Sequence, residues 1–91
     1  DIIYKSSNKK FYIDNEEIDL THLEHDLLLE FIKNKDILLS REHLLNSVWQ
    51  DSFEKKEKTV NVAIKRLKAK IDPDAKKEYI RSIRGEGYIF C

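Results

Sequence analysis

The chain has 91 residues, and 41% of them are hydrophobic, which suits a single small domain, 1–91, with one core. Its 17 Lys and Arg balance 17 Asp and Glu, no apolar run approaches the roughly 20 residues of a membrane span, and no signal peptide is apparent. Its one cysteine, Cys91, excludes an internal disulfide framework and fits a cytoplasmic protein.

Three short stretches at the start of the chain predict an antiparallel sheet. Residues 2–4, 10–13 and 17–20 are rich in β-branched and aromatic side chains, and polar clusters separate them. Strands this short are not stable alone, so we expect the sheet to pack on another element.

Two helices are predicted next. Thr21 and Glu24 have the spacing of a capping box, and apolar residues then recur at helical spacing over 22–34. After the extended link "ILLS", Ser40 caps a second predicted helix, 41–50. The buried stripes of these two helices are Leu23, Leu27, Leu28, Phe31 and Ile32, and then Leu44, Leu45, Val48 and Trp49.

A loop, a third helix and a hairpin complete the predicted order. The segment "QDSFEKKEK" has no periodicity, and a helix over about 59–71 then ends before Pro73. Two β-prone runs around "RGE" predict a hairpin over 79–91. The fold class is therefore α+β: a winged helix-turn-helix with an N-terminal antiparallel sheet, three helices and a C-terminal β-hairpin wing.

The neutral total charge conceals a strong asymmetry. Residues 1–53 carry a net charge of −5 and residues 54–91 a net charge of +5. A basic half indicates a local surface for anions such as nucleic acid. The third helix concentrates this charge, because the face opposite its apolar stripe carries four cations and no carboxylate: Lys58, Asn61, Val62, Lys65, Arg66, Lys68 and Ala69.

Such a face suits the major groove of DNA, which admits one helix. Arg66 can pair with guanine, Asn61 with adenine, and Val62 can touch a thymine methyl group. The lysines and Thr59 are predicted to bind phosphate, which positions the helix without specifying sequence. The alternative is an ordinary solvated lysine-rich face, and only the helix-then-hairpin order argues against it.

Other classes of function have weaker support. His22 and His25 have a spacing that can hold a metal on a helix, but two ligands do not make a zinc site, so we predict no metal and no cofactor. No nucleophile lies at motif spacing from a base, which predicts that the chain is not an enzyme. A winged helix that binds protein is the main rival, with Phe53 either a partner anchor or a residue that packs on the core.

A series of motifs carries a resemblance to a known family. The segments "LTHLEHDLLLEFIKNKDILLSREHLLNSVW", "KTVNVAIKRLKAKI" and "IRSIRGEGYIF" resemble the OmpR/PhoB-type output domain of bacterial two-component response regulators. The resemblance spans roughly residues 18–90, in order and with family-like spacing. It implies sequence-specific binding to double-stranded promoter DNA and the regulation of transcription.

The resemblance also implies partners and missing parts. The sequence contains no methionine, and we expect it to be cut from a longer protein whose receiver domain is phosphorylated by a cognate histidine kinase. Such domains pair head-to-tail on DNA, and the loop 50–57 corresponds to one that touches RNA polymerase in some members. Four N-terminal strands are usual in the family, and the first is expected to precede the residues given.

Several positions correspond to the family's DNA contacts. They are Thr59, Val62, Lys65, Arg66 and Lys68 in the recognition helix and Ser82 and Arg84 in the wing. The resemblance implies that Ser82 contacts phosphate and that Arg84 reaches the adjacent minor groove. The chain departs from the family pattern at Gln50 (usually Gly), Asn61 (usually Asp), Ala63 (often His) and Lys68 (commonly Arg). Lysine lacks the planar two-donor fork of arginine, so Lys68 is predicted to bind phosphate.

The stretch "RGEGYIF" contains both glycines of the chain, Gly85 and Gly87. They are predicted to supply backbone angles that other residues reach only with strain, and to let the turn approach a phosphate backbone. Tyr88 and Phe90 share one face of the returning strand and are expected to tie it to the core.

Overall fold

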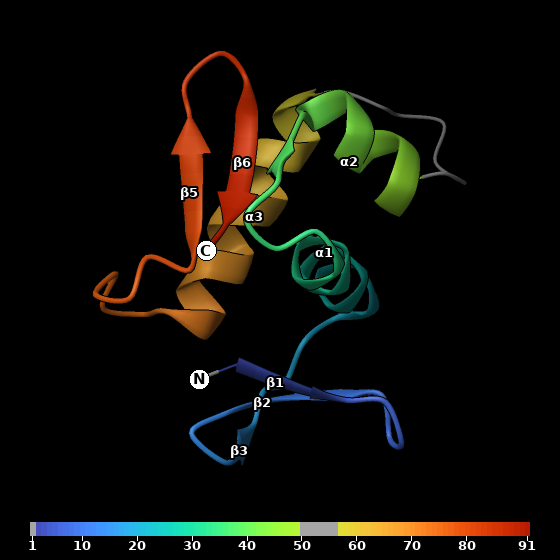
Figure 1. Ribbon diagram of the computed structural model, residues 1–91, viewed down its shortest axis with the longest axis vertical. Coiled ribbons are helices and arrows are strands. Elements are labelled where there is room, and N and C mark those ends of the chain that lie inside the picture. Colours follow the sequence, from blue (N-terminus) through green and yellow to red (C-terminus); the bar gives the residue numbers. More distant parts are fainter. Residues whose placement is uncertain (1, 50–56) are drawn as a thin grey trace.

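The computed structural model describes residues 2–49 and 57–91, and within them the predicted order of elements is confirmed (Figure 1). Three N-terminal strands lead into two helices, and the third helix precedes a C-terminal hairpin. The elements are β1 (Ile2–Lys5), β2 (Lys10–Ile13), β3 (Glu16–Glu17), α1 (His22–Lys33), β4 (Leu38–Leu39), α2 (Arg41–Val48), α3 (Glu57–Ile71), β5 (Ile80–Ile83) and β6 (Gly87–Phe90).

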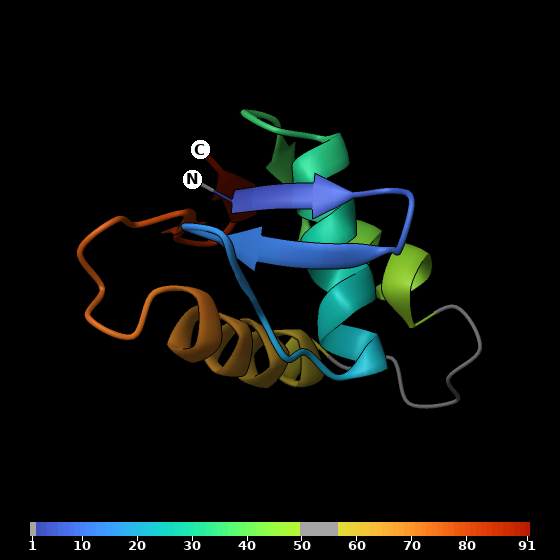
Figure 2. The same cartoon turned by 90° about the horizontal axis from the view of Figure 1, so that it is seen from below.

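The N-terminal strands form an antiparallel meander in the order β1-β2-β3, and Figure 2 shows β1 and β2 lying across α1. The ring of Phe11 is buried, 4.7 Å from the ring of Tyr4 and 5.0 Å from that of His25 on α1, so aromatic contacts fix the sheet to the helix. The third predicted strand, 17–20, was wrong in its bounds. Ile18 and Leu20 lie beyond the end of β3 and pack, partly buried, against the core.

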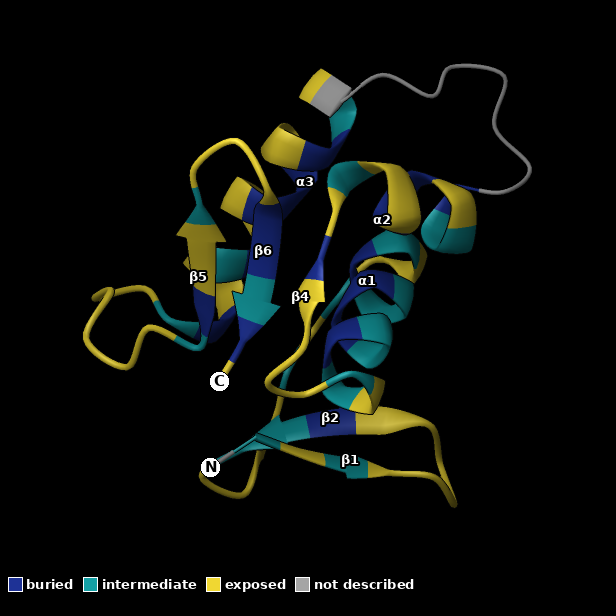
Figure 3. Cartoon of the chain, turned by 45° about the horizontal axis from the view of Figure 1, so that its top comes forward, coloured by how far each residue is buried: buried dark blue, intermediate teal, exposed yellow. Residues whose placement is uncertain are grey.

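Helix α1 begins with the predicted capping box. The hydroxyl of Thr21 accepts a hydrogen bond from the backbone N–H of Glu24, and the Glu24 carboxylate accepts one from the backbone N–H of Thr21. Leu27, Leu28 and Phe31 are fully buried on the inner face, which appears dark blue in Figure 3. This face is the centre of the core, against which α2, α3 and the hairpin pack.

The link between α1 and α2 contains a strand that the sequence did not predict. Leu38 and Leu39 form β4, which pairs antiparallel with β6. Ser40 then caps α2 as predicted, since its hydroxyl accepts a hydrogen bond from the backbone N–H of His43. Helix α2 ends at Val48 and not at residue 50, and Trp49 is buried at its C-cap.

Helix α3 begins at Glu57, two residues before its predicted start, and ends at Ile71 as predicted. Its predicted buried stripe is confirmed and consists of Val60, Ile64, Leu67 and Ile71. This stripe packs against α1, α2 and the hairpin. The opposite side of the helix carries mostly exposed residues, which are yellow in Figure 3.

The C-terminal hairpin belongs to a three-stranded sheet in the order β4-β6-β5. Gly85, with φ of +76°, supplies the predicted left-handed turn conformation. Gly87 has φ of +149°, and a Cβ atom there would lie 2.1 Å from the carbonyl oxygen of Leu39. The prediction for Gly87 therefore needs correction, because its missing side chain admits the backbone of β4 rather than a phosphate. None of the helices in residues 2–49 and 57–91 has the length and hydropathy needed to cross a membrane.

Candidate nucleic-acid interface

The exposed face of α3 brings most of the predicted contact residues together. Lys58, Asn61, Val62 and Lys65 follow the spacing of one helical stripe, and all four are exposed. Val62 is 42% exposed, which is unusual for a large apolar side chain. Arg66 is also exposed, whereas Thr59 and Lys68 are half-buried at the two margins of this face.

The cations of this face have no carboxylate partner among the described residues. Some cations elsewhere do pair with a carboxylate, as in Lys10–Glu17 at 3.2 Å and Lys77–Asp14 at 3.6 Å. Among the described residues, no carboxylate oxygen lies within 4.0 Å of the cations of the predicted interface: Lys58, Lys65, Arg66, Lys68 and Arg84. None of the carboxylates that the structure describes therefore neutralises these cations.

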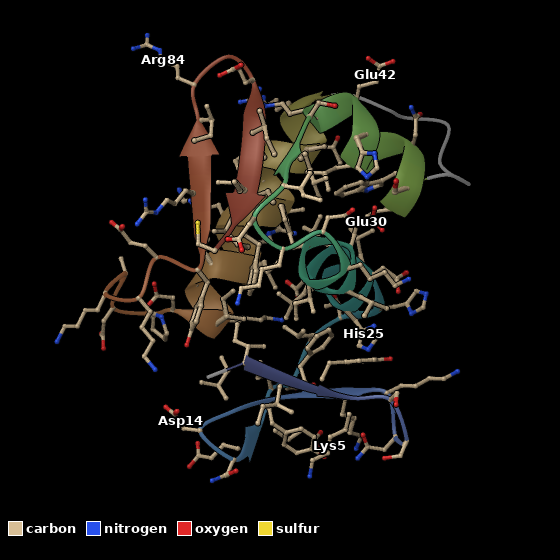
Figure 4. The ribbon with its side chains drawn as sticks, viewed as in Figure 1. Lys5, Asp14, His25, Glu30, Glu42 and Arg84 are labelled. Carbon is tan, nitrogen blue, oxygen red and sulfur yellow. The ribbon has the colours of Figure 1, made fainter. Side chains whose placement is uncertain are left out.

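The wing projects beside this face. Ser82 and Arg84 are exposed, and Figure 4 shows the Arg84 side chain pointing away from the body of the protein at the hairpin tip. The turn closes with a hydrogen bond from the backbone N–H of Glu86 to the carbonyl oxygen of Ile83. Glu86 is exposed as well, so a carboxylate lies two positions from the arginine.

A groove separates the wing from the end of α3 and brings two predicted contacts to one site. It has a volume of about 480 Å³, and both Lys68 and Ser82 line it. Half-buried Tyr79 also lines it, and the ring of Tyr79 stacks on Phe90 with centroids 6.2 Å apart. Lys68 and Ser82 offer a cation and a hydroxyl, but Asp72 and Glu78 also line the groove, and their carboxylates oppose the binding of an anion inside it.

Asn61 makes contacts within the protein that the sequence did not predict. Its carboxamide oxygen accepts a hydrogen bond from Arg41 Nε at 2.9 Å and another from the hydroxyl of Tyr88. The Arg41 guanidinium also lies 5.3 Å from the centre of the Tyr88 ring. We call these three residues the Asn61 joint, since they connect α2, α3 and β6.

Arg41 is a functional candidate that the sequence reasoning missed. It lies at the first position of α2, half-buried, and it has no carboxylate within 4.0 Å among the described residues. Its guanidinium adds a sixth cation to the region of Lys58, Lys65 and the wing. The sequence signal that would have found Arg41 is the "SR" pair at the start of α2, taken together with the neutral residue Asn61 on α3.

An ion pair connects α1 to the interface helix α3. Lys70 Nζ lies 2.6 Å from Glu24 Oε1, and Glu24 is the buried charged residue of the core. Burial opposes ionisation of this carboxyl group, but the hydrogen bonds from Lys70 and Thr21 outweigh it and hold the Glu24 pKa below its ordinary value of 4.5. The pair therefore stabilises the orientation of α3 at neutral pH.

The histidines of α1 have contacts of their own. His25 Nε2 lies 2.8 Å from the carbonyl oxygen of Lys9, and His22 Nε2 lies 3.3 Å from a carboxylate oxygen of Asp26. Within residues 2–49 and 57–91, no group of three His, Cys, Asp or Glu side chains is arranged to hold a metal ion. His25 instead joins the β1–β2 turn to α1.

Comparisons with known proteins identify the family of the chain. Residues 15–90 match the family described as "Transcriptional regulatory protein, C terminal". The response regulator ArlR of Staphylococcus saprophyticus is 34% identical over 88 residues, which are 97% of this chain and 40% of that protein. The chain therefore spans less than half the length of this relative.

Solved structures show the same fold. The DNA-binding domain of CssR from Bacillus subtilis has a TM-score of 0.81 and 32% identity, with 100% of both chains covered. The RstA DNA-binding domain of Klebsiella pneumoniae, solved in complex with the RstA box, has a TM-score of 0.85 and 25% identity, covering 99% of this chain and 90% of that chain. The chain thus belongs to the OmpR/PhoB-type family of winged-helix DNA-binding domains, the output domains of response regulators that regulate transcription.

Proposed function

We propose that this domain binds specific sequences of duplex DNA, with α3 in the major groove and the wing at the adjacent minor groove. The observation that carries the proposal is the exposed face of α3, whose cations have no carboxylate partner among the described residues. The groove of B-DNA is about 12 Å wide and accommodates one helix. The RstA DNA-binding domain, which was solved in complex with the RstA box, supports DNA as the partner here.

The residues of this face divide by the chemistry that they offer. Arg66 has the two-donor fork that pairs with guanine O6 and N7, and exposed Val62 offers an apolar surface to a thymine methyl group. Lys58, Lys65 and Thr59 are proposed to bind phosphates along the groove.

The wing region contributes the remaining contacts. Lys68 offers a cation and exposed Ser82 a hydroxyl, and we assign each of them to a phosphate of the DNA backbone. Arg84 at the exposed tip is assigned to the minor groove, which attracts arginine through its negative potential.

A pair of substitutions tests this division. Selection from random duplexes first defines the bound sequence. Arg66→Ala should then cost about 1–3 kcal/mol and relax the preference at one base pair, since it removes a bidentate contact. Lys65→Ala should weaken all sequences similarly and lower the salt slope by about one unit. Equal, sequence-independent losses for both variants would contradict the assignment of Arg66 to a base.

The whole protein is proposed to be a cytoplasmic response regulator in which residues 1–91 form the output domain. A receiver domain would precede them and be phosphorylated by a cognate histidine kinase, and phosphorylation would favour head-to-tail pairing on promoter DNA. Adjacent half-sites then raise the effective concentration of the second domain. The segment 50–57 is proposed to contact RNA polymerase, although residues 50–56 lie outside the described part of the chain. Equal promoter affinity of the phosphorylated and unphosphorylated full-length protein would contradict the proposed role of phosphorylation.

A further inference from the structure

The Asn61 joint fixes which way the amide of Asn61 faces. Arg41 Nε carries a hydrogen and can only donate, so the Asn61 atom that lies 2.9 Å from it must be the carbonyl oxygen. The Tyr88 hydroxyl meets the same oxygen from β6. The Nδ2 group of Asn61 is therefore on the other side of the amide, and Asn61 is an exposed residue of the α3 face.

These two donors occupy both acceptor positions of the amide oxygen of Asn61. A carbonyl oxygen has two lone pairs, and Arg41 and Tyr88 supply one hydrogen bond to each. Bidentate recognition of adenine needs an acceptor for N6–H₂ and a donor for N7 from the same amide. The adenine contact expected from the sequence would therefore require Asn61 to break at least one of its bonds within the protein.

We propose that Asn61 is a donor-only contact to DNA. Its Nδ2–H₂ group donates to an acceptor, either guanine O6 or N7 or a phosphate oxygen, while its Oδ1 atom holds Arg41 and Tyr88. This inference rests on the proposed function, since it requires that the face of α3 meets DNA. Asn61 also belongs to the stripe that contains Lys58 and Lys65, so the donor lies among groups that attract the same acceptors.

Neutrality is the second consequence of an amide at this position. A carboxylate at position 61 would accept the same two hydrogen bonds, but it would neutralise the Arg41 guanidinium and repel phosphate. Asn61 keeps the joint closed while leaving the charge of Arg41 in place. The two polar atoms of Asn61 therefore have separate tasks, one within the protein and one toward DNA.

Three forms of the protein test the inference: wild type, Asn61→Ala and Asn61→Asp. Each is used in selection from random duplexes, followed by titration of the selected sites, with thermal unfolding as the folding control. The Asn61→Asp variant retains an acceptor for Arg41 and Tyr88, so it keeps the joint even if Asn61→Ala is unstable. We expect Asn61→Ala to lose about three- to tenfold in affinity, which corresponds to one hydrogen bond. Asn61→Asp should lose at least as much.

The pattern of the loss identifies the acceptor. A loss confined to sites with guanine at one position assigns the donor to a base edge, and an equal loss for all sites assigns it to phosphate. The inference is overturned if Asn61→Asp binds as tightly as wild type, or if wild type selects an adenine that Asn61→Ala no longer selects. If wild type selects no duplex at all, the proposed function fails together with the inference. If wild type selects DNA and both variants match it, the inference alone fails.

Discussion

The salt dependence of DNA binding provides the sharpest test of the cationic face, because the chain as a whole has no net charge. Five cations of the predicted interface have no carboxylate partner among the described residues: Lys58, Lys65, Arg66, Lys68 and Arg84. Three of them, Lys58, Lys65 and Lys68, are assigned to phosphate, and each contact contributes about −0.9 to the slope of log K against log salt concentration, or about −2.7 for one domain. Affinity should then fall about 40-fold between 50 and 200 mM salt.

Fluorescence anisotropy titrations of a labelled duplex at several salt concentrations measure this slope. Lys65→Ala should reduce its magnitude by about 0.9, since one phosphate contact is lost. Lys10→Ala is the matched control, because Lys10 is an exposed lysine paired with Glu17 on the N-terminal sheet. A slope near zero for wild type would refute the reasoning, and so would an equal change of slope in the two variants.

Three further predictions concern the scaffold and the wing. The Glu24 pKa is lowered in the folded state, so its stabilisation is present above the ordinary value of 4.5 and is lost as pH falls through the folded value. The Glu24→Gln variant should therefore have a free energy of unfolding about 1 kcal/mol lower than wild type at pH 7, a modest loss because Lys70 is half-exposed. Urea unfolding followed by circular dichroism should show this difference shrinking in acid. Gly87→Ala should lower the melting temperature by several degrees in calorimetry, because a Cβ would clash with the Leu39 carbonyl oxygen, whereas Gly85→Ala meets open space and should suffer only backbone strain. Arg84→Ala should weaken binding to a full site but have no effect on a duplex truncated beneath the wing; equal losses on both duplexes would contradict its assignment to the minor groove.

The helices could be predicted from the sequence because their signals are local. The capping residues and the apolar period fixed α1 to within one residue of its end, and the apolar stripe of α3 proved to be its buried side. The comparisons confirm the fold class and the family, whereas the individual DNA contacts of the interface stay predictions.

The features that sequence reasoning missed depend on residues far apart in the chain. Leu38 and Leu39 become a strand only because β6 lies beside them, and two residues have no period of their own. The third strand ends at Glu17, and Ile18 packs against the core while its backbone N–H still donates to the carbonyl oxygen of Phe11 on β2. The partners of Asn61 are 20 and 27 positions away, so no local pattern could show that its oxygen is engaged.

Strand β4 has a consequence for how target preference can evolve. It pairs with β6 and is followed directly by Ser40, the N-cap of α2. The base of the wing and the start of α2 are therefore held by one segment of chain. The tip of the hairpin, residues 84–86, lies beyond this shared segment and is exposed. Substitutions at the tip can therefore alter the exposed end of the wing without disturbing the segment that joins its base to α2.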